Sequence, residues 1–216
     1  MIENYEALTV GKFEEIERVQ REYGAEDTNG RNLAILSILS DLSADELLDM
    51  KVPAFRAMMD KAAFLRRPLR PTPVLKSYKL GDLTLLPVAD IEKMTTAQYI
   101  DFQTFAKSSD GRIAELLSCF LLPEGHRYND GYAIREVQGA IRSFLPITAA
   151  NGLLAFFFRK SHRSMINILR SSARALRRAN RKKKDKRITE AMMELNMSIL
   201  SLRAGVGFPT STPCLK

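Results

Sequence analysis

The residues with the most distinctive chemistry in this chain are cationic, and they are concentrated in one stretch. Between Arg159 and Arg187, here called the basic segment, there are thirteen lysines or arginines and a single acid, Asp185, which gives a net charge of +12. The whole chain has a net charge of +8, so the remaining residues sum to −4. A local excess of this size is typical of contact with a polyanion: a nucleic acid, an acidic protein surface or an anionic lipid.

The spacing of the arginines predicts an amphipathic helix in the first part of the basic segment. At roughly 100° per residue, five arginines fall within an arc of about 60°, and mostly apolar residues lie opposite them. The planar guanidinium group suits bidentate pairing with phosphate or carboxylate. The Lys-rich run after this helix predicts a loop or a hinge. The predicted partner- or polyanion-binding residues are Arg163, Arg170, Arg174, Arg177, Arg178, Arg181, Lys182, Lys183, Lys184, Lys186 and Arg187.

A second amphipathic helix is predicted after the basic segment. Apolar residues recur along one side of it, and Gly205 and Gly207 end it before a tail that contains two prolines. The apolar stripe predicts a face that docks on a partner, formed by Ile188, Met192, Leu195, Ile199 and Leu202. The two helices around the Lys-rich turn would form either a helical hairpin or one long helix.

The sequence leaves several alternatives for what the arginines bind. Nucleic-acid phosphates would make the affinity fall steeply with salt, but no zinc-finger spacing and no interleaved aromatic residues accompany the charges. An acidic protein surface needs neither feature. A solvated basic face is the third alternative. An anionic membrane is disfavoured, because the apolar side of the predicted helix is rich in Ala and lacks Trp.

Residue patterns typical of catalysis are absent from the sequence. There is no Gly-rich phosphate loop, no Gly-x-Ser-x-Gly elbow and no His-Glu-x-x-His pair. His126 and His162 have no Cys or His neighbours at metal-ligand spacing, and His126 is expected at the surface of a polar loop. We therefore predict a non-enzymatic protein with no catalytic, cofactor-binding or metal-binding residues. The alternative is an enzyme that uses scattered carboxylates, and no residue pattern in the sequence supports it.

The rest of the chain contains two similar stretches. Leu8–Ile16 and Met94–Phe102, which are 86 positions apart, share the order apolar residue, Thr, two small residues, polar residue, aromatic residue. A second match, between Gly30–Leu36 and Gly111–Leu117, has an offset of 81. We interpret the two stretches as a duplicated helical unit. The alternative is a chance similarity between amphipathic helices.

Capping residues and apolar runs predict where the helices lie. Thr9 and Thr95 stand at N-cap positions, and Gln98 completes a capping box with Thr95. Ser43 and Glu46 form another capping box, which predicts the start of a short helix.

Further helices are predicted from apolar residues alone. Nearly all-apolar runs at Leu33–Leu39 and Ile113–Leu122 predict the buried central helices of the two halves. Tyr132–Phe144 has the helical period, and Pro146 suits the first turn of a last helix that ends in Phe156–Phe158. We expect at least one of these three phenylalanines to meet another element or another subunit, unless the helix is buried on all sides.

The join between the two halves has a different composition. Arg66–Pro73 holds three prolines and three arginines, which excludes a helix there. Val74–Leu80 and Leu83–Val88 then flank the pair Gly81-Asp82, and this pattern predicts a β-hairpin. Because an isolated hairpin is only marginally stable, we expect it to pack on a helical half or to pair with a neighbouring chain.

Composition favours an intracellular globular protein. With 216 residues, of which 45% are hydrophobic and 27% charged, the chain can bury a core. Cys119 and Cys214 give no disulfide framework, so a reducing compartment is the default. The start, Met1–Glu6, lacks the features of a signal peptide. The most apolar stretch, Phe144–Phe158, is too short and too interrupted for a membrane span, which needs ~20 residues.

Three runs of residues resemble a pattern in small proteins of tailed bacteriophages. Val88–Phe102, which comes after the hairpin, is similar to a motif in proteins of crAss-like phages and of phages with Bacteroidota hosts. Leu8–Phe13 resembles a first copy of that motif, and Leu145–Phe158 resembles the C-terminal helix of those proteins. The resemblance covers most of the chain before the basic segment, and it includes neither the basic segment nor the tail. It implies a non-enzymatic protein of virion assembly, such as a tail assembly chaperone, and carries over no catalytic residue.

We therefore predict a mainly α-helical protein with three parts. Residues 1–73 form an N-terminal helical half, residues 74–158 form the β-hairpin and a second helical half, and residues 159–216 form a basic helical arm with a flexible tail.

The expected function is bacteriophage morphogenesis through protein–protein contacts, as a tail-assembly-chaperone-like protein or a minor virion component. The alternative is a sequence-independent nucleic-acid-binding protein that uses the basic arm. The expected partners are other phage structural or assembly proteins, with non-specific nucleic acid and a second copy of the chain as further options. No cofactor is expected, and the expected location is the host cytoplasm or the virion.

Overall fold

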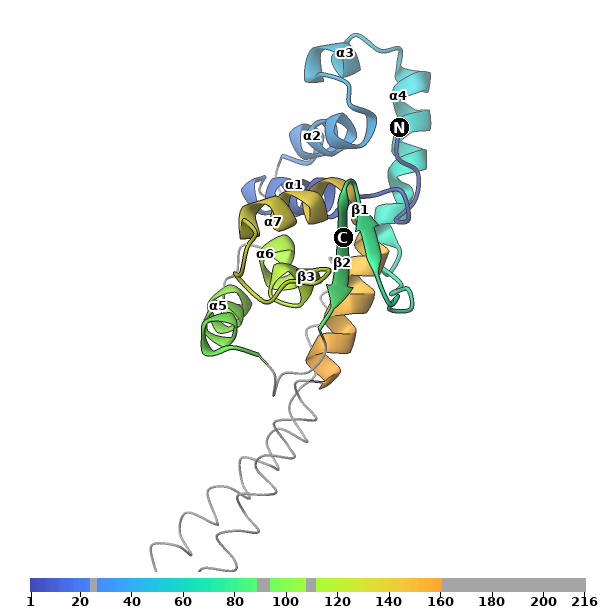
Figure 1. Ribbon diagram of the computed structural model, residues 1–216. Helices are drawn as coiled ribbons and strands as arrows, with labels where there is room; N and C mark the ends of the chain where they lie inside the picture. The colour runs from blue at the N-terminus through green and yellow to red at the C-terminus, as the bar shows by residue number, and fades with distance from the viewer. Residues whose placement is uncertain (24–26, 89–93, 108–111, 161–216) are drawn as a thin grey trace, which may run out of the picture.

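The computed structural model describes residues 1–23, 27–88, 94–107 and 112–160 (Figure 1). Within these ranges the chain is mostly α-helical with one small antiparallel sheet, which confirms the predicted fold class for this part. Apart from Arg159 and Lys160, the predicted basic arm lies outside the described residues. None of the described helices is both long and apolar enough to cross a membrane.

The first two helices pack against each other and begin at capping residues. α1 (Val10–Glu22) starts where predicted, because the Thr9 hydroxyl oxygen accepts a hydrogen bond from the backbone N–H three residues later at 3.5 Å. α2 (Thr28–Ser40) contains the predicted apolar run. Its N-cap is Asp27, whose carboxylate accepts from the N–H three residues later at 2.8 Å. The two helices are in contact with each other.

A short helix and a longer one come next, and both pack on α2. α3 (Ala44–Leu48) has the predicted capping box. The Glu46 N–H donates to Ser43 Oγ at 3.2 Å, and the Ser43 N–H donates to Glu46 Oε2 at 2.8 Å. α4 (Val52–Ala62) runs directly into a turn of 3₁₀ helix, η1 (Ala63–Arg66).

The proline-rich join has no helix beyond η1, as predicted. Residues 67–77 contact the helix formed by residues 147–160, where the Thr72 N–H donates to the Thr148 carbonyl oxygen at 3.1 Å. Gly152 permits this contact, because a Cβ atom there would lie 2.1 Å from the Thr72 carbonyl oxygen. The join is therefore a packed part of the fold.

The predicted hairpin is present. β1 (Tyr78–Leu80) pairs antiparallel with β2 (Leu83–Pro87), and Tyr78 lies opposite Leu85. Gly81 begins the two-residue turn with a φ of +61°, in the left-handed region that glycine adopts without strain.

The strand that completes the sheet corrects the predicted helix Ile113–Leu122. α6 (Ile113–Ser118) ends four residues earlier, and β3 (Leu121–Pro123) pairs antiparallel with β2, with Leu86 opposite Leu122. Periodicity does not separate a buried helix from a buried strand in a short apolar run. Here the edge of β2 supplies backbone partners for β3, so the hairpin is stabilised within the chain as part of a three-stranded sheet.

α5 (Thr96–Lys107) begins at the second predicted capping box. The Gln98 N–H donates to Thr95 Oγ1 at 3.2 Å, and the Thr95 N–H donates to Gln98 Oε1 at 3.3 Å. The Gln98 side chain is only 3% exposed, and its Nε2 also donates to the Cys119 carbonyl oxygen at 2.6 Å. One glutamine therefore caps α5 and joins it to the end of α6.

α7 (Ile134–Phe144) and the helix of residues 147–160 complete the described chain, both within ranges predicted to be helical. The chain between them pairs with the start of α1, because the Val10 N–H donates to the Leu145 carbonyl oxygen at 2.9 Å. The first and last described helices are thus connected through their backbones.

One hydrophobic core extends through the described residues, from Leu8 to Phe157. Phe157 is 2% exposed and stacks on Phe120, with ring centroids 4.2 Å apart and planes at 15°. Its neighbour Phe158 lies against Phe102 of α5, with centroids 6.4 Å apart. The run of three phenylalanines thus meets more than one element, as expected.

Candidate functional site

An open cleft lies between α1, α6 and α7. It has a volume of about 730 Å³ and is lined by side chains of both charges. The charged lining residues are Lys12, Glu14, Glu15, Arg18, Arg21, Arg112, Glu115 and Arg142. Charged groups that converge in one concave region are the usual starting point for a binding or catalytic site.

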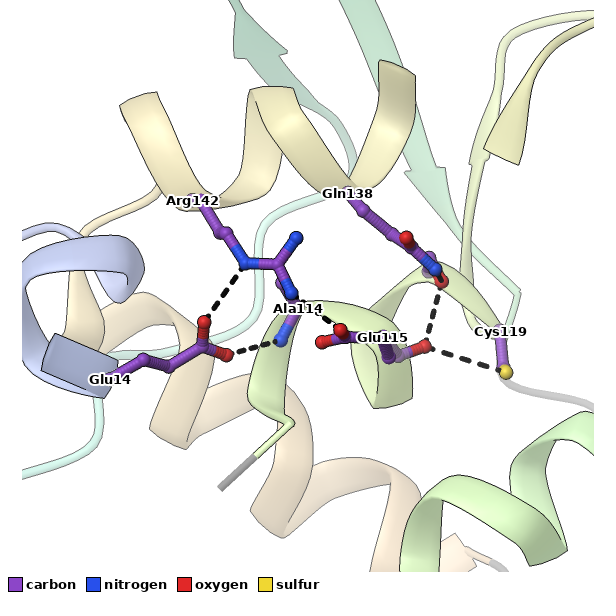
Figure 2. A network of polar contacts seen from close by, with 7 residues as sticks. Glu14, Ala114, Glu115, Cys119, Gln138 and Arg142 are labelled. Atoms are coloured by element: carbon purple, nitrogen blue, oxygen red, sulfur yellow. Dashed lines mark hydrogen bonds and ion pairs between the residues drawn. The ribbon is translucent and has the colours of Figure 1, made fainter. Parts of the chain in front are cut away.

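Arg142, on α7, connects two carboxylates of this cleft (Figure 2). Its Nε donates to Glu14 Oε2 at 3.0 Å, and its Nη2 donates to Glu115 Oε1 at 2.5 Å. Burial opposes the charged guanidinium, but the hydrogen bonds to the two carboxylates outweigh it and raise the pKa of Arg142 above its ordinary value. The side chains of Glu14 and Glu115 are 16% and 19% exposed, against 36% for Arg142. Arg142 therefore stays charged and holds two largely buried carboxylates from different helices.

Glu14 also caps a helix that is distant in sequence. Its Oε1 accepts a hydrogen bond at 3.0 Å from the N–H of Ala114, in the first turn of α6. The residue at the N-cap of α6, Arg112, makes no side-chain capping bond of its own. The first N–H groups of a helix need acceptors, and a carboxylate is favoured there by the helix dipole. Glu14 thus ties α1 to the start of α6.

Further polar contacts continue along α6 towards α7 (Figure 2). The Ser118 hydroxyl donates to the Glu115 carbonyl oxygen at 2.7 Å and accepts from Gln138 Nε2 at 3.3 Å. The Cys119 thiol donates to the same carbonyl at 3.6 Å. These bonds join the last turn of α6 to the middle of α7.

A buried tyrosine links the end of α6 to α5. The Tyr128 hydroxyl donates to Asp101 Oδ2 at 2.7 Å and lies 4.0 Å from the Cys119 sulfur. Burial raises the pKa of Tyr128, and the hydrogen bond to Asp101 raises it further. Burial also raises the pKa of the Cys119 thiol to about 12. The nucleophilic thiolate is therefore negligible at neutral pH.

The described polar groups are arranged to connect helices. The hydrogen bonds of Glu14, Arg142, Gln138 and Tyr128 each join two elements, and together they bring α1, α5, α6 and α7 into one unit. Among the residues that the structure describes, no three His, Cys, Asp or Glu side chains are placed to hold a metal ion. His126 is exposed, as predicted, and its Nδ1 lies 3.1 Å from the Asp130 carbonyl oxygen.

The predicted binding residues lie outside the described part of the chain. This applies to the basic set from Arg163 to Arg187 and to the docking face from Ile188 to Leu202. The structure shows the first two cations of the basic segment, Arg159 and Lys160, which are exposed at the end of the last described helix. The Lys160 Nζ lies 5.7 Å from the ring centroid of Phe156.

Glu14, Glu115 and Arg142 were not predicted as a group from the sequence. Arg142 is 27 residues from Glu115 and 128 from Glu14, so no local spacing connects them. One signal was present: Glu115 is an acid inside an apolar run, and a buried charge needs a partner. That signal predicts that a cation lies nearby without saying which one.

Comparison of the chain with protein-family models, with curated proteins and with solved structures found no match. The functional conclusions therefore rest on the residues of this chain and their arrangement.

Proposed function

We propose that the protein is a non-enzymatic assembly protein of a tailed bacteriophage. It binds other phage structural or assembly proteins, as a tail-assembly-chaperone-like factor or as a minor virion component, and acts in the host cytoplasm or in the virion. The assignment to phages is supported by the sequence resemblance alone, which is carried by Leu8–Phe13, Val88–Phe102 and Leu145–Phe158. The binding role is supported by charge and by the structure of the described residues.

The observation that carries the binding role is the way in which the basic segment joins the rest of the protein. The helix of residues 147–160 is anchored in the core by Leu153 and Phe157, which are 0% and 2% exposed. Arg159 and Lys160, at its end, are the first of the thirteen cations. The first two cations of the basic segment therefore lie on a packed helix, which lowers the cost in conformational entropy of presenting these two side chains to a partner.

The polar clusters of the described residues support the assignment of partner binding to the basic segment and not to the cleft. Arg142, Glu14 and Glu115 are paired with one another, and Tyr128 is paired with Asp101. These groups have a structural role that accounts for their position. The basic segment has a net charge of +12, which favours a polyanionic partner, and an acidic protein surface is the one proposed.

The test is capture of partners from infected cells by three forms of the full chain. The first is the wild type, and the second carries Arg170→Gln, Arg174→Gln and Arg177→Gln. The control removes the same charge from exposed arginines elsewhere and carries Arg56→Gln, Arg127→Gln and Arg135→Gln. We expect the wild type and the control to retain a phage structural protein that the second form loses. Loss from both variants, or from neither, would contradict the proposal.

Sequence-independent binding of nucleic acid is the second candidate, and the same charge favours it. If the arginines contact phosphates, the logarithm of the affinity for duplex DNA falls linearly with the logarithm of the salt concentration, with a slope of roughly −0.9 per contact. Negligible binding of the full chain at ~150 mM salt would exclude this candidate. Tight binding that Arg170→Gln, Arg174→Gln and Arg177→Gln abolish together would favour it over a protein partner.

A further inference from the structure

Two large apolar side chains stand out at the corner between α3 and α4. Leu48, the last residue of α3, is 65% exposed, and Val52, the first residue of α4, is 62% exposed. They are the most exposed large apolar side chains among the described residues. They are four positions apart in the chain, and exposed apolar side chains are candidates for interaction sites.

Acidic residues are frequent in the same stretch of the chain. Residues 41–52, here called the acidic corner, contain four acids and one cation, a net charge of −3, and these are Asp41, Asp45, Glu46, Asp49 and Lys51. Hydrogen bonds from the Ser43 backbone and side chain lower the pKa of Glu46, so this carboxylate is fully ionised at neutral pH. The corner thus combines exposed apolar side chains with a net negative charge, and protein interfaces use both apolar and charged groups.

The basic segment has the complementary chemistry. It carries a net charge of +12, and its predicted arginine stripe is accompanied by apolar residues that include Met165, Ile168 and Leu169. Opposite charges at the rim of an interface and apolar groups at its centre favour specific association.

The acidic corner and the start of the basic segment lie at opposite ends of the described residues (Figure 1). α3 and the first turns of α4 stand at one end, and the helix of residues 147–160 ends at the other, with α1, α7 and the sheet between them. A basic segment that begins at the far end is better placed to meet the corner of a second molecule than the corner of its own.

We propose that the basic segment of one copy docks on the acidic corner of a second copy. This inference rests on the proposed function, since it takes the basic segment to be a protein-binding element. The contact joins two different surfaces, so the first copy keeps a free corner and the second copy keeps a free basic segment for further neighbours. A contact of this type either is reciprocated in a two-fold dimer or repeats into rings or open chains of subunits.

The contact is tested by the mass of the full chain in sedimentation velocity, over a range of protein concentrations. We expect the wild type to self-associate at about 50 mM salt and to dissociate towards monomer at about 500 mM salt, because the charges are screened. A corner variant carries Asp45→Asn, Leu48→Ser and Asp49→Asn. A segment variant carries Arg170→Gln, Arg174→Gln and Arg177→Gln. Each is expected to self-associate at least about tenfold more weakly than the wild type.

Mixing the two variants is the decisive step. The segment variant keeps an intact corner and the corner variant keeps an intact basic segment, so an equimolar mixture is expected to form a 1:1 dimer that neither forms alone. The matched control, Glu124→Gln with Asp130→Asn, removes two exposed carboxylates elsewhere and is expected to self-associate like the wild type.

Three results would overturn the inference. They are a wild type that stays monomeric at low salt, a corner variant that associates like the control, and a mixture without the 1:1 dimer. These failures are separable from a failure of the proposed function. A monomeric protein that still captures a phage protein leaves the function standing, whereas self-association without such capture supports the contact and removes the function.

Discussion

The cleft between α1, α6 and α7 and the acidic corner are both rich in charge, but their charges are used differently. In the cleft, Arg142 pairs with Glu14 and Glu115, whose side chains are less than a fifth exposed. In the acidic corner, Leu47 is the one buried side chain of α3, and the charged residues of α3 are exposed. Even the ion pair there, between Lys12 and Asp41 at 2.6 Å, leaves the aspartate 77% exposed.

This difference separates charges that stabilise the fold from charges that are available to a partner. A buried pair strongly destabilises the protein when it is broken, whereas exposed charges contribute little to folding. Substitutions in the cleft should therefore change the free energy of unfolding, and substitutions in the corner should change binding. Matched substitutions, one in the packed region and one at an exposed position, test this separation.

The largest effect is expected in the hydrophobic core. Phe120 is 1% exposed and stacks on Phe157, so Phe120→Ala should lower the free energy of unfolding by about 3–5 kcal/mol, through lost burial and a residual cavity. Leu48→Ala, in the acidic corner, should change it by less than about 0.5 kcal/mol. Urea unfolding followed by circular dichroism measures both. Equal effects would contradict the contrast between the two regions.

Breaking the cleft network should have the next largest effect. Arg142→Met leaves Glu14 and Glu115 without their cation and is expected to cost about 2 kcal/mol, less than a fully buried pair because Arg142 is 36% exposed. The control is Lys61→Met. It removes an exposed ion pair with Glu3, at 2.8 Å, and should cost at most about 0.5 kcal/mol. If thermal and urea unfolding do not distinguish the two variants, the network does not stabilise the fold.

Substitutions of two helical glycines, one packed and one exposed, test the same contrast with a smaller expected effect on the free energy of unfolding. Gly152→Ala places a Cβ atom 2.1 Å from the Thr72 carbonyl oxygen, so the join must move and the free energy of unfolding should fall by about 1–2 kcal/mol. Gly139→Ala, on an exposed site of α7 with open space around it, should raise it by about 0.5–1 kcal/mol. A loss of stability in both variants would mean that the close approach of the join is not the cause.

The last comparison concerns the capping box of the acidic corner, where a small local effect is expected. Ser43→Ala removes half of the α3 capping box and should cost about 1 kcal/mol locally, visible as faster amide hydrogen exchange in α3. Because Ser43 lowers the pKa of Glu46, the stabilisation is present above the ordinary pKa of 4.5 and is lost as the pH falls through the lowered value. Carboxyl NMR titration should show the Glu46 pKa returning towards 4.5 in Ser43→Ala. An unchanged value would show that the cap does not hold the carboxylate.

Elements that depend on close neighbours in the chain were predicted well. Thr95 and Gln98 meet across three positions, as do Ser43 and Glu46, and both capping boxes are present. The two-residue turn at Gly81 is equally local. The features that were missed depend on remote partners. β3 is a strand because the β2 edge lies beside it, and nothing within Leu121–Pro123 distinguishes it from the end of a helix.

The amino-acid sequence alone determined where most helices begin, the position of the hairpin turn and the separation of a +12 segment from a mildly acidic remainder. These properties depend on backbone preferences and charge counts within a few residues, which chain order specifies directly. Only the tertiary structure decided that Glu14 caps α6, that Arg142 holds two carboxylates and that Leu48 and Val52 remain exposed. Such outcomes depend on which surfaces the packed helices leave near one another, and contacts across 100 or more residues carry no local signature.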